Sequence, residues 1–151
     1  MSEFKDLVKE DLVFIKDEEM QKEEIIRFLC EKVCEYYGIN KKEDIIQNIL
    51  KREKSRSSGI GAGLAFPHAR MLDLDEVKIA VLINKKPIDF KSLDGKPTHI
   101  VFFFLSPLRK GEYHLRFLHF ITNFANKNVF NKVLSINSPK EFIDIWNSIK
   151  S

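Results

Sequence analysis

The sequence predicts an α/β fold in which a small β-sheet lies between two layers of helices, a three-layer α/β/α sandwich. Residues 77–83 and 100–105 are β-branched or aromatic runs without polar alternation, which is typical of strands covered on both faces. Segments with apolar residues at helical spacing lie before and after these runs. The chain has 151 residues, is 44% hydrophobic, and shows no internal repeat or low-complexity linker. These features predict a single domain over residues 1–151.

Before the first of these runs, the pattern predicts one short strand and two helices. Residues 12–15 form a short apolar run, as expected of a strand. A helix is expected over residues 22–37, where apolar side chains recur at helical spacing. Asn40, with Glu43 three residues later, resembles a capping box and predicts the start of a second helix. Arg52 is then expected in the last turn of that helix or just beyond it.

After the second run, two further helices are expected. The first covers residues 112–126, and its apolar face includes Leu115 and Leu118. The second begins at residues 138–141 (S-P-K-E), where Ser is the cap, Pro takes the first helical position and Glu follows three residues after the cap. Residues 84–99, between the two runs, carry two prolines and an Asp-Gly pair, which predict turns and loop.

Composition and charge exclude several classes of function. The formal net charge is +3, from 25 Lys and Arg against 22 Asp and Glu, and both signs are mixed along the chain. This leaves no basic stripe of the kind that binds nucleic acid. The sequence contains no run of about 18 apolar residues, so a membrane span is not predicted. The N-terminus also lacks the apolar segment of a signal peptide. We therefore expect a cytoplasmic protein without nucleic-acid binding or direct membrane insertion.

The two cysteines do not predict a metal site. Cys30 and Cys34 lie four residues apart, which makes them neighbours on one face of the first expected helix. Four-coordinate metal binding needs further ligands, and the sequence supplies no obvious second pair. We expect two buried thiols and no metal.

The richest local pattern is residues 57–70, S-S-G-I-G-A-G-L-A-F-P-H-A-R, which presents one histidine from an unusual backbone. Its three glycines can take positive φ and allow close approach of a partner, and Pro67 fixes its own φ. His68 is therefore expected to be held in place. The spacing is neither the Rossmann fingerprint nor a phosphate-binding loop that ends in Gly-Lys-Ser/Thr, so a nucleotide is not expected. The three glycines are Gly59, Gly61 and Gly63.

The segment G-I-G-A-G-L-A-F-P-H-A-R resembles the matching segment of phosphotransferase-system enzyme IIA domains of the fructose/mannitol type. The resemblance spans residues 11–149 and implies a mixed sheet. It implies that His68 carries a phosphoryl group, with Arg52 and His114 around that group. It also implies the small histidine phosphocarrier HPr as donor, and neither a metal nor a nucleotide cofactor. Residues 87–97 (P-I-D-F-K-S-L-D-G-K-P) are especially similar to the nitrogen-regulatory members, which are free-standing.

The residue types suit the implied phosphotransferase chemistry. A neutral imidazole such as His68 can attack a phosphoryl group without a separate base. The guanidinium of Arg52 stays charged and donates in a fork that matches two phosphoryl oxygens. His114 can donate a hydrogen bond from a ring nitrogen. The backbone N–H groups of the loop over residues 59–63 are expected to add anion contacts.

Four other residues near this pattern are assigned smaller roles. His99 precedes a strand and is expected at its end. His119 follows His114 by five residues, some 140° around a helix at about 100° per residue, so it is not expected to share the site. Arg56 and Arg70 flank the site in sequence. They either contact an acidic partner surface or are only solvated.

Three functions stay open. The first is a nitrogen-type regulatory enzyme IIA that binds a regulatory protein target according to its phosphorylation state. The second is a sugar-uptake enzyme IIA that passes its phosphate to the IIB domain of a sugar permease. The third is an interaction domain of the same fold without phosphotransfer. The three residues His68, Arg52 and His114 argue against the third, and the tract at 87–97 favours the first over the second.

Overall fold

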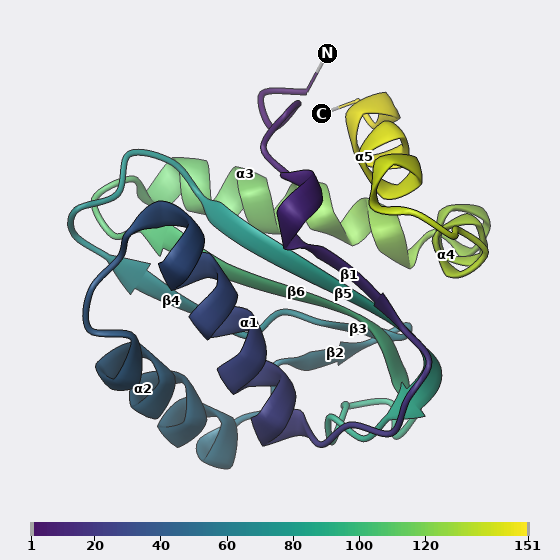
Figure 1. Ribbon diagram of the computed structural model, residues 1–151, viewed down its shortest axis with the longest axis horizontal. Coiled ribbons are helices and arrows are strands. Elements are labelled where there is room, and N and C mark those ends of the chain that lie inside the picture. The colour runs from purple at the N-terminus through teal and green to yellow at the C-terminus, as the bar shows by residue number, and fades with distance from the viewer. Residues whose placement is uncertain (1, 151) are drawn as a thin grey trace.

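A six-stranded sheet forms the centre of the computed structural model, which describes residues 2–150 (Figure 1). The strand order is β1-β5-β6-β3-β2, and β4 also pairs with β6. Strands β3 and β4 therefore follow each other along the same edge of β6. The strands are β1 (Val13–Lys16), β2 (Gly59–Gly61), β3 (Leu64–Ala65), β4 (His68–Met71), β5 (Lys78–Ile88) and β6 (Thr98–Pro107).

The sheet is mixed, as predicted. The two long strands β5 and β6 are antiparallel, and they contain the two apolar runs of the sequence. Strand β1 runs parallel to β5, and both β3 and β4 run parallel to β6, whereas β2 and β3 form an antiparallel pair. Strand β5 continues to Ile88, so Pro87 lies inside a strand and not in the expected loop. The first strand begins at Val13, because Leu12 ends a short 3-10 helix, η1 (Glu10–Leu12).

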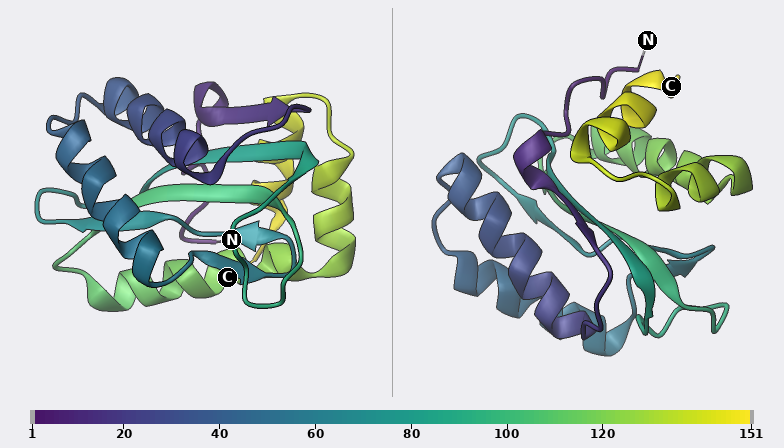
Figure 2. Two further views of the ribbon diagram at one scale, coloured as in Figure 1. Left: turned by 90° about the horizontal axis from the view of Figure 1, so that it is seen from below. Right: turned by 45° about the vertical axis from the view of Figure 1, so that its right-hand side comes forward.

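Helices cover both faces of the sheet, which confirms the three-layer α/β/α sandwich (Figure 2). Side chains of β6 alternate between two apolar clusters: Phe102 and Phe104 lie under one helix layer, and Phe103 and Leu105 under the other. None of the helices in residues 2–150 is long and apolar enough to cross a membrane. One layer holds α1 (Lys22–Tyr37) and α2 (Lys42–Ser55), and the other holds α3 (Gly111–Ile121), α4 (Lys127–Leu134) and α5 (Pro139–Ser148).

Two helix boundaries follow the sequence signals. Helix α1 occupies the predicted range and ends at Gly38, whose φ of 66° is the left-handed conformation that glycine adopts readily. Helix α5 begins with the predicted capping box. The Ser138 hydroxyl accepts the N–H of Glu141, and the Glu141 carboxylate accepts the N–H of Ser138 at 2.9 Å.

The start of α2 differs from the prediction. The residue before the helix is Lys41, with φ of 66°, and no side chain caps the helix, so Asn40 is not its cap. Glu43 does not reach back toward the helix start. Its carboxylate instead accepts hydrogen bonds from Arg27 of α1 at 2.9 and 3.1 Å. A contact between two helices thus replaces the local box that the spacing predicts.

The single helix predicted over residues 112–126 is also wrong. Helix α3 ends at Ile121, and a 3-10 helix, η2 (Thr122–Ala125), follows it. The next residue, Asn126, caps the unpredicted helix α4, because its side chain accepts the N–H groups of Asn128 and Val129. The cap at Asn126 thus starts a new helix after the 3-10 segment, which the apolar spacing over residues 112–126 does not reveal.

The buried face of α3 is rotated relative to the predicted one. Leu115, expected on the apolar face, is 65% exposed. The buried positions are His114, Phe117, Phe120 and Ile121, whose spacing of three and four residues places them on one helix face. The histidine itself therefore belongs to the face that packs on the sheet.

The cysteines are buried on α1, as the spacing predicts. Cys30 and Cys34 both face the cluster between α1 and the sheet. Burial raises the pKa of both thiols, which keeps them in the unreactive protonated form.

The first residues of the described chain pack against its last helix. The indole N–H of Trp146 donates to the Phe4 carbonyl at 2.8 Å, and the N–H of Asp6 donates to the Asn147 side chain at 2.9 Å. Both side chains of the first pair lie in the apolar cluster beneath α3, α4 and α5. Figure 1 shows the two ends of the chain close together beside α5.

Candidate active site

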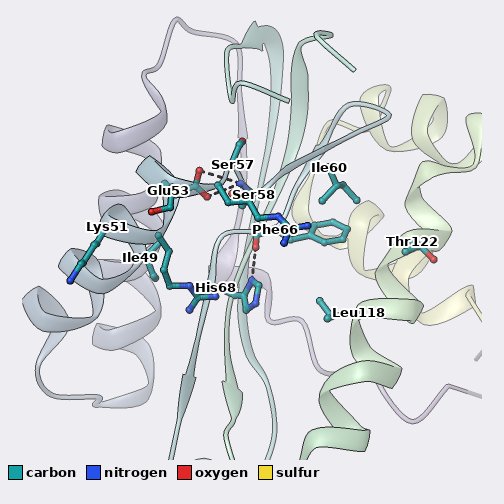
Figure 3. Close-up of a pocket in the computed structure, with 13 residues that line it drawn as sticks. Ile49, Lys51, Glu53, Ser57, Ser58, Ile60, Phe66, His68, Leu118 and Thr122 are labelled. Carbon is teal, nitrogen blue, oxygen red and sulfur yellow. Dashed lines mark hydrogen bonds between the residues drawn. The ribbon is translucent and has the colours of Figure 1, made fainter. Parts of the chain in front are cut away.

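A cleft of about 720 Å³ opens beside His68. It lies between the end of α2, the β2–β3 hairpin and the face of α3 (Figure 3). Figure 3 shows His68 across from Leu118, with Ile49 on the α2 side. The lining combines apolar side chains with cationic ones. They include Arg52, Arg56, Ile60, Phe66, His68 and Leu118.

The glycines of residues 57–70 build a tight hairpin. Gly61 and Gly63 have φ of 94° and 80°, which other residues rarely adopt. A Cβ on Gly63 would also lie 2.5 Å from the Phe130 ring. Gly59 is needed for a different reason, since a Cβ there would lie 2.4 Å from the Ser92 hydroxyl. The hairpin carries the chain directly into β3 and β4 and so positions His68.

The structure does not bring these glycines together with the three predicted side chains. Within residues 2–150, which the structure describes, none of these glycines lines the cleft. Ile60, which lies between two of them in the sequence, does line it. The N–H of Gly59 donates to Ser57 Oγ at 2.9 Å. The N–H of Ala62 at the hairpin tip donates to the Asp94 carboxylate at 3.1 Å. These two N–H groups therefore already donate to acceptors within the protein, and the carboxylate at the hairpin tip is that of Asp94.

His68 is the first residue of β4, and two contacts hold its ring. Nδ1 lies 2.7 Å from the carbonyl oxygen of Phe66, the dashed contact in Figure 3. A carbonyl only accepts, so Nδ1 carries the hydrogen and Nε2 keeps its lone pair. The ring also stacks on Phe104, with 4.8 Å between centroids and 4° between planes. Nδ1 is thus anchored, whereas Nε2 has no hydrogen-bond partner within the described residues 2–150.

The surroundings keep His68 uncharged. Burial lowers its pKa below the usual 6.5, and the positive charges of Arg52 and Arg70 lower it further. The hydrogen bond to the Phe66 carbonyl opposes this shift only in part. The imidazole is therefore neutral at pH 7, the form in which a ring nitrogen acts as a nucleophile.

His114 lies next to His68, with 5.5 Å between ring centroids. It projects from the first turn of α3 and is 7% exposed. Its Nδ1 lies 2.8 Å from Ser106 Oγ. Burial, followed by the positive charge of Arg70 and the neighbouring His68 and Arg52, lowers the pKa of His114 to about 4. The site therefore contains two adjacent neutral imidazoles.

Three arginines lie near the cleft or near the histidine pair, in different ways. Arg52 lies in the last turn of α2, as predicted, and lines the cleft. Arg56 follows the helix and lines the same cleft with an exposed side chain. Arg70 is not a freely solvated side chain, because its Nη2 donates to the carbonyls of Pro107 and Leu108 at 2.9 and 3.2 Å.

Sequence reasoning missed three contributors to this site. The Phe66 carbonyl gives no signal, since every residue has one. Glu53, beside Arg52, accepts the N–H of Ser58 at 3.0 Å and pairs with Lys22 of α1 at 2.5 Å. Ser106 has a weak signal, as the polar residue that ends the apolar run at residues 100–105.

The other two histidines lie apart from the pair, as expected. Nδ1 of His99 lies 2.9 Å from the carbonyl oxygen of Asn84 on the neighbouring strand β5. His119 is exposed and lines a separate cavity with Leu115 and Arg116. Neither lines the cleft beside His68.

Comparison with known proteins decides the family. The family model for the phosphoenolpyruvate-dependent sugar phosphotransferase system, EIIA 2, matches residues 6–149. This chain is an EIIA 2 domain. Its relatives carry two kinds of name. A nitrogen regulatory protein of Bradyrhizobium diazoefficiens is 31% identical over 113 residues, which are 75% of this chain and 73% of that one. A fructose-specific EIIA component of Haloferax volcanii is 26% identical over 136 residues, 89% and 88% of the two chains.

Solved structures share the fold of this EIIA 2 domain. The nitrogen regulatory protein IIA-Ntr of Neisseria meningitidis superposes with a TM-score of 0.86 at 23% identity, over 96% of this chain and 99% of that one. Mannitol IIA of Escherichia coli, in its complex with phosphorylated mannitol IIB, gives a TM-score of 0.76 at 17% identity, over 94% and 98%.

Proposed function

We propose that this EIIA 2 domain is a phosphocarrier that accepts a phosphoryl group from phosphorylated HPr on Nε2 of His68. The observation that carries the proposal is the hydrogen bond between Nδ1 and the Phe66 carbonyl. It assigns the hydrogen to Nδ1 and leaves the Nε2 lone pair for the reaction, in a ring that burial keeps neutral.

The transfer is an exchange between two phosphohistidines. The lone pair of His68 Nε2 forms a bond to phosphorus while the bond from phosphorus to the donor's ring nitrogen breaks, and that nitrogen keeps the bonding pair. The donor and acceptor are aligned in a transient protein complex, and charge on the three phosphoryl oxygens needs stabilisation. Arg52 supplies a two-pronged cationic contact, and His114 supplies a hydrogen bond. No metal or nucleotide takes part in the proposed step.

We infer a nitrogen-type regulatory role, in which the phosphorylation state of His68 controls binding to a regulatory protein target in the cytoplasm. The nitrogen regulatory relative from Bradyrhizobium diazoefficiens and the tract at residues 87–97 support this role. A phosphoryl group adds negative charge to a cleft lined by Arg52 and Arg56, in which the carboxylate of Glu53 is paired with Lys22, so it changes the surface that a partner meets.

The second candidate is sugar transport, with the phosphoryl group passed on to a IIB domain. EIIA domains partner with IIB domains, as in the mannitol complex, and the fructose-specific relative from Haloferax volcanii favours the same role. A sugar permease encoded next to this chain supports transport, whereas a neighbouring nitrogen sigma factor supports regulation. Transfer from phosphorylated protein to a purified IIB domain tests the transport role directly.

The shared phosphocarrier step is tested by incubation with phosphoenolpyruvate, enzyme I and HPr. Phosphohistidine is then mapped by mass spectrometry under alkaline conditions. We expect phosphate on His68, complete loss in His68→Ala, and wild-type labelling in the matched control His119→Ala. Phosphate on His99, His114 or His119 in the His68→Ala protein would sink the assignment.

A further inference from the structure

Ser106 and Arg70 lie beside the histidine pair without a part in the transfer described above. The register of β4 on β6 pairs His68 with Phe104 and Arg70 with Ser106. Alternate residues of a strand share one face of the sheet. His68, Arg70 and Ser106 therefore share the face that α3 covers, and His114 of α3 contacts Ser106 there.

The contact between Ser106 and His114 holds a single hydrogen, whose position decides the chemistry of His114. Ser106 is fully buried, and its Oγ lies 2.8 Å from Nδ1. If Nδ1–H donates to the hydroxyl, Nε2 of the neutral ring presents a lone pair. If the hydroxyl donates to Nδ1, Nε2 carries the hydrogen and becomes a donor. Only the second arrangement attracts a phosphoryl oxygen.

The position of Arg70 favours the second arrangement. Two carbonyls at the end of β6, those of Pro107 and Leu108, hold its Nη2. Its Nε is buried and has no hydrogen-bond partner among residues 2–150. Arg70 is the register partner of Ser106 on the neighbouring strand, so its fixed positive charge attracts the oxygen lone pairs of the buried hydroxyl and repels its hydrogen. The Ser106 hydrogen is thereby turned from Arg70 toward Nδ1 of His114.

We propose that Ser106, with its hydroxyl oriented by Arg70, holds His114 in the tautomer protonated at Nε2, so that His114 donates a hydrogen bond to the phosphoryl group on His68. The inference rests on the proposed phosphocarrier function. It makes Ser106 and Arg70 positioning residues, since both act through His114. The two rings then have opposite tautomers: His68 has a free lone pair at Nε2, and His114 has a hydrogen there. A preset donor next to the reacting nitrogen stabilises charge without rearrangement during transfer.

The tautomer is measured in the unmodified protein by long-range ¹H–¹⁵N NMR of the histidine rings at pH 7.5. We expect His114 with hydrogen on Nε2, and the opposite tautomer at His68. His114 with hydrogen on Nδ1 would overturn the proposal. This reading needs no variant and no phosphoryl donor, so it stands apart from the proposed function.

The consequence for transfer is measured with phosphoramidate, a small phosphoryl donor that requires no protein docking. In Ser106→Ala we expect a mixture of His114 tautomers and phosphorylation of His68 slowed by roughly 10-fold or more, as for loss of a hydrogen bond to a charged group. Ser106→Thr keeps the hydroxyl and should restore both readouts, and Ser135→Ala, at an exposed serine, should change neither. Arg70→Met should move the tautomer toward Nδ1, whereas Arg70→Lys keeps the charge and should hold it.

The outcomes separate the two proposals. Wild-type rates and an unchanged tautomer in Ser106→Ala contradict the role of Ser106 and leave the phosphocarrier function standing. If neither phosphoramidate nor phosphorylated HPr labels His68 while the tautomer is as expected, the phosphocarrier function fails and the tautomer assignment survives. Should Ser106→Ala not fold, the wild-type spectrum and the Arg70 pair still decide the proposal.

Discussion

The charge state of individual side chains prepares the His68 site for an anion. His68 and His114 are neutral because burial and neighbouring arginines disfavour their protonated forms. The nearby carboxylate, Glu53, is already paired with Lys22. The charge of Arg52 therefore has no carboxylate partner among the residues that the structure describes. The guanidinium of Arg52 is therefore available to pair with an incoming phosphoryl group.

Replacement of Arg52 by lysine separates the chemistry of this residue from its role in folding. The side chain is exposed, so Arg52→Lys should leave the circular dichroism spectrum and the melting temperature unchanged. Phosphoryl transfer to His68 should slow about 10-fold or more, because a lysine cannot make the two-pronged contact. Stopped-flow transfer from phosphorylated HPr measures the rate. Unchanged transfer together with a lower melting temperature would make Arg52 a structural residue.

The low pKa of His114 predicts a loss of stability in acid. In the unfolded chain a histidine takes up its proton near pH 6.5, whereas His114 in the folded state does so only near pH 4. Between these values the unfolded state binds more protons, so the free energy of unfolding falls as the pH drops from 6.5 toward 4. Urea unfolding at pH 7.5, 6.0 and 5.0 should show a contribution of about 1–3 kcal/mol from this residue. His114→Gln should flatten that part of the slope, and His119→Gln should retain it; equal slopes in all three proteins contradict the assignment.

Among the elements, those with long periodic patterns follow the sequence, and those set by neighbours do not. The apolar runs of β5 and β6 and the pattern of α1 are long enough that each predicts a single type of secondary structure. Strands β2 and β3 have three and two residues, too few for any period, and they exist because β6 offers an edge for pairing. The cap predicted at Asn40 fails because Arg27 of a different helix attracts Glu43. Local spacing carries no information on that contact.

Within the β2–β3 hairpin, Gly63→Ala tests the close approach to α4. The added Cβ would lie 2.5 Å from the Phe130 ring, and the residue would keep an unfavourable φ of 80°. We expect a loss of about 2 kcal/mol or more in the free energy of unfolding, read from urea titration. The control is Gly111→Ala at the start of α3, where no atom lies within 4 Å, and it should be neutral or slightly stabilising. Gly63→Ala at wild-type stability means that the hairpin is not held by this contact.

At the scale of the molecule, the cleft is the surface that a phosphoryl donor must cover. Arg56 lies on it with an exposed side chain and no ion-pair partner among residues 2–150. Arg56→Glu should reduce kcat/KM for phosphorylated HPr by roughly 5- to 10-fold at low salt, because reversal of a rim charge slows association. Phosphoramidate should label this variant normally. The matched control Lys140→Glu, on α5, should change neither, and loss with both donors would instead place Arg56 in the chemistry.

The grouping of the site residues is also a property of the whole molecule. His68 stands out in the sequence through the glycine-rich motif at residues 57–70, whereas Arg52 and His114 are indicated by the family resemblance. The contact of His114 with Ser106 and the place of Arg70 beside it depend on the register of β4 against β6 and on the rotation of α3. A one-residue slip of that register turns every side chain of β4 to the other face. Neither the register of β4 nor the rotation of α3 can be predicted from the spacing of residues along the chain.

The pairing of Phe4 with Trp146 has a consequence for synthesis of the chain on the ribosome. The partners are 142 residues apart, so the N-terminal segment emerges long before the helix that receives it. Until α5 has been released, Phe4 and its neighbours lack the indole that closes their apolar cluster. The other helix layer needs no such wait, because α1 contacts β5 and β6, and α2 contacts α1 and β4, all of which precede α5 in the chain. The two faces of one sheet are thus completed at different times, and the face that carries His68 and His114 is finished only after α5 has emerged from the ribosome.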